Sequence, residues 1–344
     1  MPLPGMRLGE IGYTPLNFEE DRMRGIMSTW KTIVVKQVHR LLGFACLLTL
    51  AFGLLAGSLA GQQTGQKTFA SPGDAAEAMI AAAKAGDTDA LLQIFGPEGK
   101  ELLSSGDDVA DKNARNNVVQ RYEQMHRLVR EPDDTVTVYM GAENWPFPIP
   151  LLKKGNAWYF DTPVGKQEVL YRRIGKNELA TIDVCHAIVD AQKQYQSETH
   201  DGESVKQYAL KLVSDPGKHN GLYWKAAAGE PQSLIGPLIA EAAAAGYTRK
   251  QSGPTPFHGY IYKHLSSQGP AAPGGAKDFV VDGKMTGGFA VLAYPVEYRN
   301  SGVMTFMVNQ DGIVYQRDLG PETAKIAAAM TQYNPDPSWQ KAEE

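Results

Sequence analysis

The sequence predicts an α+β fold made of two small domains, each with helices packed on an antiparallel sheet. Three observations support this prediction. Helix signals come first within residues 69–165 and strand signals follow, and residues 166–344 repeat that order. The 344 residues are 43% hydrophobic and 21% charged, an ordinary globular composition. At ~150 residues per domain, this length corresponds to two domains once a leader is removed.

Residues 1–60 are expected to be a leader. Residues 41–60 (LLGFACLLTLAFGLLAGSLA) carry no charge, basic residues up to Arg40 precede them, and small residues end the run at Ala60. This order is typical of a secretory signal peptide, with Met27 as an alternative start. An uncleaved membrane anchor is the other interpretation, because twenty apolar residues can span a bilayer. We therefore expect an exported protein, periplasmic or extracellular, with inner-membrane anchoring as the alternative.

The expected first domain follows a polar linker at residues 61–68. Ser71 is a good cap for a first helix that Gly86 stops, and Asp87 or Thr88 caps a second. A third helix is expected from residue 109 to about 129, capped by Asp107 or Asp108, because apolar residues recur at helical spacing. That apolar stripe consists of Ala114, Val118, Tyr122, Met125 and Val129. Strands are expected at residues 135–139, 145–152 (interrupted by prolines) and 157–160.

This stretch resembles the cone-shaped nuclear-transport-factor-2-like domains. The resemblance rests on the opening helix, the break at Ala85-Gly86-Asp87 before a short second helix, and the final hairpin with Trp158. It implies helices wrapped on a curved sheet with a pocket between them. It does not imply an enzyme, because such a fold carries catalysts and binders alike.

The expected second domain opens with a long helix over residues 166–196. Residues 208–210, a loop at 215–221 and residues 222–224 follow it, and a short apolar helix is expected over 235–245. Further strands are expected at residues 259–265, 288–294, 305–308 and 313–315, the last two joined by the turn at residues 309–312. Pro321 starts a final helix with Ile326, Met330 and Tyr333 facing inward.

This half is similar to the globular domain of type IV pilins and pseudopilins. The similarity rests on the amphipathic helix ending at Tyr195 and on the strand segments at residues 259–262, 289–295 and 305–315. In pilins the hydrophobic N-terminal helix continues directly into this one, whereas here a whole domain lies between them. Filament assembly by the usual route is therefore not expected.

As a whole, the chain closely resembles an uncharacterised family of exported bacterial proteins, domain of unknown function 2950. Four stretches carry the resemblance, namely GPEGKELLSSGD (96–107), NWPFPIPLLKKG (144–155), GPAAPGGAKDFVVDGKMTGGFAVLAYPVEY (269–298) and SGVMTFMVNQDGIVYQRDLGP (301–321). The family brings no established activity with it.

Charge and motif content argue against several function classes. Without residues 1–60 the net charge is −6, and no Lys/Arg cluster offers a footprint for nucleic acid. The histidines outside the leader form no HExxH pattern, and His258 and His264 would lie ~20 Å apart on one strand. We therefore expect no metal ligands, no cofactor and no catalytic residues.

Two further segments have structural interpretations. Cys185 lies on the apolar stripe of the long helix, which indicates a buried, unreactive thiol. Residues 269–275 are rich in glycine and proline but lack the Lys-Ser/Thr of a phosphate loop, so they are expected to connect two strands. A recognition loop is the alternative, because exposed ordered loops often carry function.

The candidate ligand-facing or partner-facing residues are aromatic: Trp145, Phe147, Trp158, Tyr223 and Trp224. Trp145 and Phe147 alternate with prolines, which suits an edge strand or a rim, although core packing is the competing explanation. We expect a non-enzymatic binding or adaptor protein of the bacterial envelope, with another envelope protein or a small apolar ligand as partner. The alternatives are a small-molecule enzyme with its pocket in the first domain, or a minor pilin-like filament component.

Overall fold

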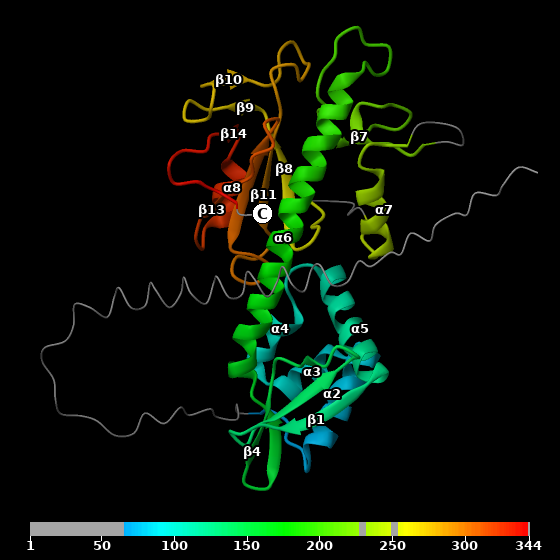
Figure 1. Ribbon diagram of the computed structural model, residues 1–344, viewed down its shortest axis with the longest axis vertical. Coiled ribbons are helices and arrows are strands. Elements are labelled where there is room, and N and C mark those ends of the chain that lie inside the picture. Colours follow the sequence, from blue (N-terminus) through cyan, green and yellow to red (C-terminus); the bar gives the residue numbers. More distant parts are fainter. Residues whose placement is uncertain (1–64, 227–231, 249–253, 343–344) are drawn as a thin grey trace, which may run out of the picture. The chain divides into compact units, whose positions relative to one another are not determined.

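The computed structural model describes residues 65–226, 232–248 and 254–342, and helices alternate with mainly antiparallel sheets along them (Figure 1). This arrangement confirms the α+β fold class. The described residues belong to one compact unit. The predicted leader at residues 1–60 lies outside them. None of the helices in the described ranges has the length and apolarity that a membrane crossing requires.

The first half contains helices α2 (Pro72–Ala85), α3 (Thr88–Phe95), α4 (Lys100–Leu103) and α5 (Asp108–Gln124), the 3-10 turn η2 (Pro97–Gly99), and strands β1 (His126–Arg130), β2 (Val136–Met140), β3 (Trp145–Pro146), β4 (Leu151–Lys154) and β5 (Ala157–Phe160). The predicted caps are confirmed. The Ser71 side chain accepts a hydrogen bond from the backbone N–H of α2, Asp87 does so for α3, and Asp107 does so for α5. Gly86 ends α2 in the left-handed conformation, with φ of 67°.

The predicted third helix is too long at its C-terminal end. Helix α5 ends at Gln124, and the stripe positions Met125 and Val129 do not belong to it. The backbone N–H of Gly141 donates to the carbonyl of Met125, so the chain joins the ladder with β2 at that point. Cross-strand pairing therefore overrides the helical spacing, and residues 126–130 form β1.

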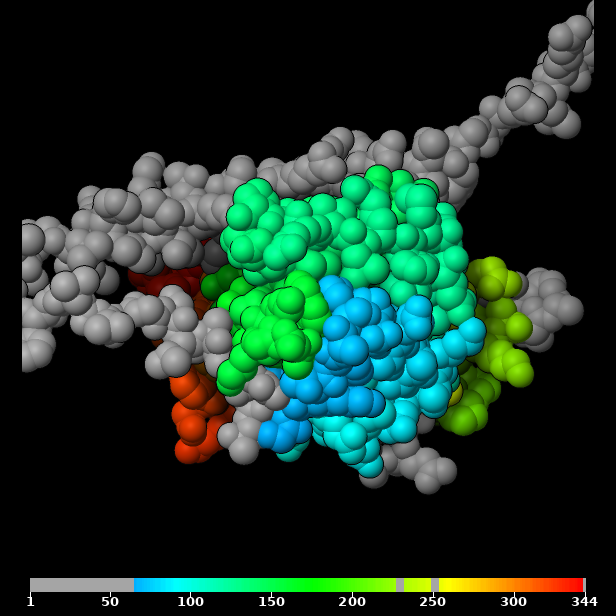
Figure 2. Space-filling view, turned by 90° about the horizontal axis from the view of Figure 1, so that it is seen from below, coloured from blue at the N-terminus to red at the C-terminus, as the bar shows by residue number. Residues whose placement is uncertain are grey.

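The first sheet has the order β1-β2-β4-β5, and β3 pairs with β2 beyond the end of β4. The predicted strand 145–152 is thus two short strands separated by a proline-containing bend. Helices α2 and α3 pack against β5, and α5 packs against β2. The enclosed core includes Met79, Ile94, Phe95, Val138, Phe147, Leu151 and Phe160. Figure 2 shows this half from below, with α2 in blue and the sheet residues in blue-green to green.

Helix α6 (Thr162–Ser197) connects the two cores as one continuous element of 36 residues. It starts four residues before the predicted residue 166, because Pro163 occupies its first turn, where a missing N–H costs nothing. Gly165 lies against the backbone of Ile149, and a Cβ there would approach Ile149 Cα to 2.6 Å. The predicted domain boundary after residue 165 falls within α6, and the division into two domains stays a prediction.

The second half contains helices α7 (Gly236–Ala244) and α8 (Thr323–Ala329), and strands β6 (Lys211–Val213), β7 (Gly221–Tyr223), β8 (Tyr260–Leu265), β9 (Ser267–Gln268), β10 (Lys277–Asp278), β11 (Ala290–Pro295), β12 (Met304–Asn309), β13 (Tyr315–Asp318), β14 (Gln332–Tyr333) and β15 (Gln340–Lys341). The main sheet has the order β15-β13-β12-β11-β8 and is antiparallel throughout. Helix α6 packs on β11 and β12, and α8 packs on β11.

The predicted final helix is wrong in its inward face and its end. Thr323 and Ala327 are the buried residues of α8, whereas the Ile326 side chain is 37% exposed. Tyr333 is buried, but it belongs to β14, which pairs in parallel with β9. The turn at residues 309–312 is confirmed, while its second strand starts at Tyr315 rather than at residue 313.

Candidate functional site

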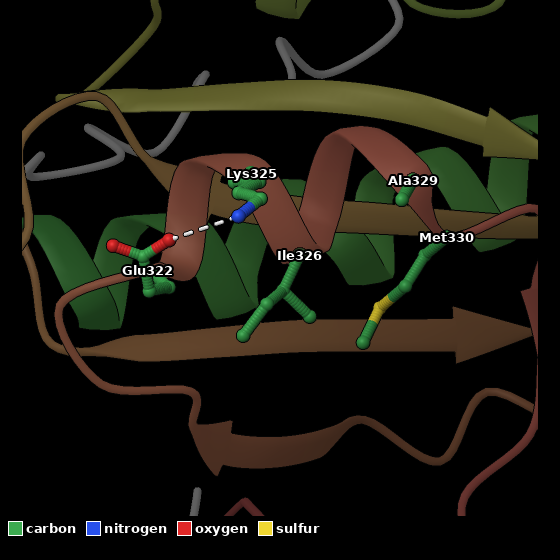
Figure 3. A pocket seen from close by; sticks show the side chains of 5 residues that line it. All are labelled: Glu322, Lys325, Ile326, Ala329 and Met330. Atoms are coloured by element: carbon green, nitrogen blue, oxygen red, sulfur yellow. Dashed lines mark hydrogen bonds and ion pairs between the residues drawn. The ribbon is translucent and has the colours of Figure 1, made fainter.

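An apolar hollow lies on the surface beside α8. It is largely open to solvent, spans about 490 Å³ and is lined along α8 by Glu322, Lys325, Ile326, Ala329 and Met330. We call this surface the α8 groove. Figure 3 shows Ile326 and Met330 extending from the same side of the helix, with the Glu322–Lys325 ion pair at its beginning. The ion pair is exposed, with 3.5 Å between Lys325 Nζ and the Glu322 carboxylate.

Polar contacts at partly buried and exposed atoms hold α8 in the position that forms this groove. The ammonium group of Lys263 on β8 donates to the carbonyls of Ala327, Ala328 and Met330 at 3.3, 2.6 and 2.7 Å. A positive charge at the C-terminal end of a helix complements the partial negative charge of its free carbonyls. At the other end, the Thr323 hydroxyl donates to the carbonyl of Gly320 at 2.6 Å. The helix is therefore fixed at both ends.

The α8 groove suits an apolar side chain better than a reacting group. Its walls are mostly aliphatic, and its two charged groups pair with each other. Sequence reasoning missed this surface because it assigned Ile326 to the core. The small residues Thr323 and Ala327, four positions apart, were the available signal, since they allow close approach to the sheet.

A second set of polar residues lies between the two hydrophobic cores. We call Ser105, Asp107, Asp111, Arg173 and Asn300 the junction cluster. Asp107 is 1% exposed. One carboxylate oxygen accepts from Ala110 N at 3.0 Å, and the other accepts from the Tyr247 hydroxyl at 2.7 Å and from Gly259 N at 3.1 Å. The helix cap of α5 thus also binds two segments of the second half.

Arg173 on α6 makes the corresponding contacts from the opposite direction. Its guanidinium donates to the carbonyls of Glu101 and Leu102 at 2.9 and 2.6 Å and to the side-chain oxygen of Asn300. Asn300 in turn donates to the carbonyl of Ser104 at 2.8 Å and to Glu297 at 2.7 Å. The three segments that meet here are held by hydrogen bonds between partners more than 70 residues apart in sequence.

Burial shifts the titration of the junction cluster. It raises the pKa of Asp111, against the lowering effect of hydrogen bonds from the Ser105 backbone and side chain. It also lowers the pKa of Arg173, and the nearby carboxylates of Asp111 and Glu297 oppose that shift. Perturbed pKa values often mark active sites, but structural networks produce them as well. Because the carboxylate oxygens of Asp107 and Asp111 already accept hydrogen bonds within the chain, we interpret this cluster as structural.

No set of three His, Cys, Asp or Glu side chains in the described ranges is arranged to hold a metal ion. His264 lies on β8, but His258 precedes that strand, with φ of 51°. A smaller cavity of about 220 Å³ lies between α6 and the β12–β13 connection. It is lined by Ile182, His186, Gly312, Ile313, Val314, Lys341 and Ala342.

A family model, described as a protein of unknown function (DUF2950), matches residues 66–342. The chain belongs to this family. No curated protein and no solved structure matches it. One stretch that carries the family resemblance supplies members of the junction cluster of this DUF2950 chain, and another supplies a hydrogen-bond partner of that cluster. Residues 96–107 supply Ser105 and Asp107, and residues 269–298 supply Glu297, which binds Asn300. The resemblances to nuclear-transport-factor-2-like domains and to pilins stay predictions.

The candidate aromatic residues of the DUF2950 chain lie in separate places. Half-buried Trp145 on β3 lies between two guanidinium groups, 5.6 Å from Arg121 and 5.2 Å from Arg172. Trp158 on β5 is half-buried and pairs with Phe69. Trp224 follows β7 and meets the His219 ring at 4.8 Å. Tyr223 ends β7 and packs on the second core. Their roles toward a partner stay predictions.

Aromatic rings pack between the helices and the sheet in the first half. Phe147 is 8% exposed, and its ring lies 6.5 Å from Phe95 and 6.0 Å from Phe160. Phe95 and Phe160 are themselves 5.3 Å apart. Phe147 therefore belongs to the core of the DUF2950 chain, where it packs against Phe95 and Phe160. The alternation with prolines indicated the backbone conformation of this segment. It did not indicate whether the Phe147 side chain points into the core or toward the rim.

The loop at residues 269–275 connects β9 and β10, as expected. Buried Gln268 donates to the carbonyls of Pro273 and Gly275 at 2.7 and 2.8 Å. Asn334 accepts from Ala271 N at 2.8 Å. These contacts fix the loop from within, and its use as a recognition loop stays a prediction.

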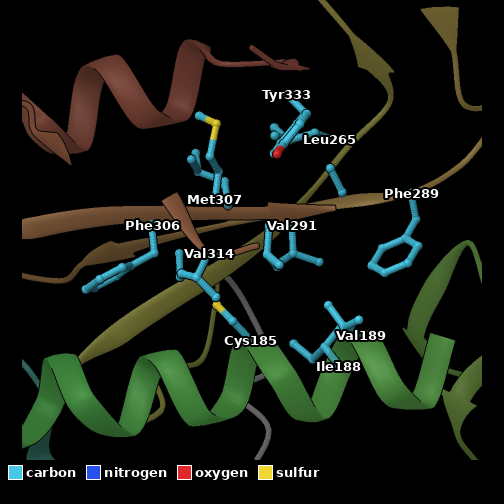
Figure 4. Close-up of a cluster of buried hydrophobic side chains, with 14 of the residues drawn as sticks. Cys185, Ile188, Val189, Leu265, Phe289, Val291, Phe306, Met307, Val314 and Tyr333 are labelled. Atoms are coloured by element: carbon cyan, nitrogen blue, oxygen red, sulfur yellow. The ribbon is translucent and has the colours of Figure 1, made fainter. Parts of the chain in front are cut away.

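Cys185 is buried between α6 and the main sheet, as predicted (Figure 4). Burial raises the pKa of its thiol from 9.0 to about 12. In a Cys46→Ser variant, which retains this one thiol, we expect a disulfide reagent to react about a thousandfold more slowly than with the unfolded chain. The same variant in guanidinium chloride is the control. Equal rates in the two states would contradict the burial of this group.

Proposed function

We propose that this DUF2950 protein is an exported, non-enzymatic binding module of the cell envelope. In this proposal the α8 groove holds an apolar side chain of another envelope protein. One observation supports this proposal. Ile326, Ala329 and Met330 line a hollow of about 490 Å³ on α8, and hydrogen bonds at both ends of α8 hold the helix in place. A fixed apolar concavity binds without a large ordering cost, because it needs no rearrangement to accept its partner.

Export rests on the sequence of residues 41–60 and is part of the same proposal. The aromatic filling of the first half and the use of the junction carboxylates within the chain favour a binder over an enzyme. An enzyme would instead need polar groups free to meet a substrate.

Photo-cross-linking in cells tests this proposal. A chain with p-benzoyl-phenylalanine in place of Ile326 is expected to give one discrete cross-linked product with an exported protein. The same probe in place of exposed Asn156, in the β4–β5 turn, is expected to give none. Mass spectrometry of the product identifies the partner and its compartment.

Two charge substitutions sharpen the test. Ala329→Glu places a carboxylate in the groove and is expected to reduce the cross-linked fraction roughly tenfold, because a buried charge without a partner is unfavourable. Ala328→Glu is the matched control, because Ala328 is also exposed on α8 but does not line the groove. Equal yields from the two variants, or equal products from residues 326 and 156, would refute the proposal.

A further inference from the structure

Within the described ranges, strand β1 is the outer strand of the first sheet and pairs with β2 alone. Four of its five residues are exposed, and the fifth is half-buried. The Leu128 side chain on this strand is 38% exposed, and that of Met125, the residue just before the strand, is 44% exposed. The edge is therefore accessible both along its backbone and on the side that faces the core. In Figure 2 the blue-green residues of this half form part of the viewed surface.

The ladder decides which backbone groups point outward. Gly141 N donates to Met125 O at 2.8 Å at one end, and Glu131 N donates to Thr135 O at 2.9 Å at the other. Inward and outward backbone groups alternate along an antiparallel strand. Between these two bonds, Arg127 and Val129 direct their N–H and C=O groups toward β2. The intervening residues of β1, with Leu128 at the centre, direct theirs outward.

The charged side chains of β1 make contacts with nearby residues of the first half. Arg127 donates to Asn144 Oδ1 at 3.0 Å, and its guanidinium lies 4.7 Å from the Tyr139 ring. Arg130 pairs with Asp134 at 3.0 Å. Long charged side chains often protect an edge strand by obstructing it. Here they pair locally instead, and no backbone hydrogen bond among the described residues uses the outward N–H of Leu128.

At this edge, the apolar face of the sheet that packs on the core is partly exposed to solvent. Leu128 pairs with Val138, so the two side chains share one face. Val138 is fully buried, whereas Leu128 is more than one third exposed. A further strand beside β1 would place its own side chain next to Leu128 and extend the core by one row.

We propose that β1 accepts an extended segment of a partner protein as an additional strand. The segment carries apolar side chains on the face of Leu128 and carboxylates on the face of Arg127. This surface is independent of the α8 groove and goes beyond the function proposed above. Opposite charge favours carboxylates on that face, because exposed Arg127 lies there, whereas Arg130 shares the face of Leu128. A second copy of the chain fits less well, since antiparallel self-pairing about Leu128 sets Arg130 against His126 of the other copy.

The test uses the full chain and a fluorescent peptide of seven residues that alternates glutamate and valine. Fluorescence polarisation is expected to show saturable binding, with about tenfold weaker binding of the matched peptide that alternates lysine and valine. Leu128→Pro removes the central outward donor and leaves the bonds to β2 in place, because proline is tolerated where the N–H faces solvent. This variant is expected to bind at least about tenfold more weakly, while Leu128→Thr retains binding within about threefold.

Hydrogen exchange on the unmodified chain keeps the test decisive if the proline variant folds poorly. Binding of the glutamate–valine peptide is expected to slow exchange of the Leu128 amide, and not of the Val129 amide, which the β2 ladder already protects. The absence of saturable binding, or unchanged exchange at Leu128, overturns the proposal. Dimers in analytical ultracentrifugation that Leu128→Pro dissociates would also overturn it, because a second copy would then occupy the edge.

Discussion

Replacing Asp107 with alanine is expected to lower the free energy of unfolding by about 3 kcal/mol. The substitution removes the cap of α5, which contributes about 1 kcal/mol. It also leaves the Tyr247 hydroxyl and the Gly259 N–H without their acceptor in a buried place, at about 1 kcal/mol or more for each. Urea denaturation followed by circular dichroism, with linear extrapolation to water, measures the change.

Two matched variants separate the contributions at this position. Asp108→Ala removes an exposed carboxylate one residue further along and is expected to cost no more than about 0.5 kcal/mol. Tyr247→Phe removes one of the three partners of Asp107 and is expected to cost about 1 kcal/mol. The structural interpretation of the junction cluster fails if Asp107→Ala costs no more than Asp108→Ala.

His264 is expected to make the second core sensitive to acid. Both ring nitrogens are buried and have no hydrogen-bond partner among the described residues. Burial lowers the pKa of His264 from 6.5 to about 4. Above pH 6.5 the imidazole is neutral in the folded and unfolded states, so it adds no pH dependence. Below that pH the unfolded chain takes up a proton that the folded chain does not bind until about pH 4.

Stability is therefore expected to fall by about 3 kcal/mol as the pH decreases from 6.5 to about 4. His264→Phe removes the titrating group and keeps a ring of similar size, so its stability should fall less over this range. Urea denaturation of both proteins from pH 7 to pH 4 gives the two curves. Subtracting one from the other removes the titration of groups that both proteins share, such as His258 and Asp111. If the free energies of unfolding of the two proteins changed in parallel with pH, protonation of His264 would not destabilise the folded state.

Local sequence signals predicted the helix starts well because their physics is local. Ser71, Asp87 and Asp107 each accept a backbone N–H three residues ahead, so a short window of sequence contains the whole interaction. The other partners of Asp107 are 140 and 152 residues away. Nothing near Asp107 in the sequence indicates them, and the junction cluster was accordingly missed.

Two of the wrong element assignments share one physical cause. Helical spacing continued through Met125 and Val129, but pairing with β2 stabilised the extended alternative. In α8, hydrophobicity pointed to Ile326 as the buried residue, while close approach to the sheet selected Thr323 and Ala327. In both cases a tertiary contact decided between alternatives that periodicity alone left nearly equal. The α8 groove, which depends on that orientation, could not be predicted for the same reason.

The last strand of the main sheet has a consequence for how the protein is made. Strand β15 pairs with β13, and Trp339 just before it is 7% exposed within the second core. Translation supplies the residues of the first core, which end at Phe160, long before it supplies these. The ribosome must therefore synthesise nearly the whole second half before its core can close, whereas the first core has all its strands much earlier. Maturation of the two cores is thus ordered in time by their place in the chain, with the N-terminal core ready first.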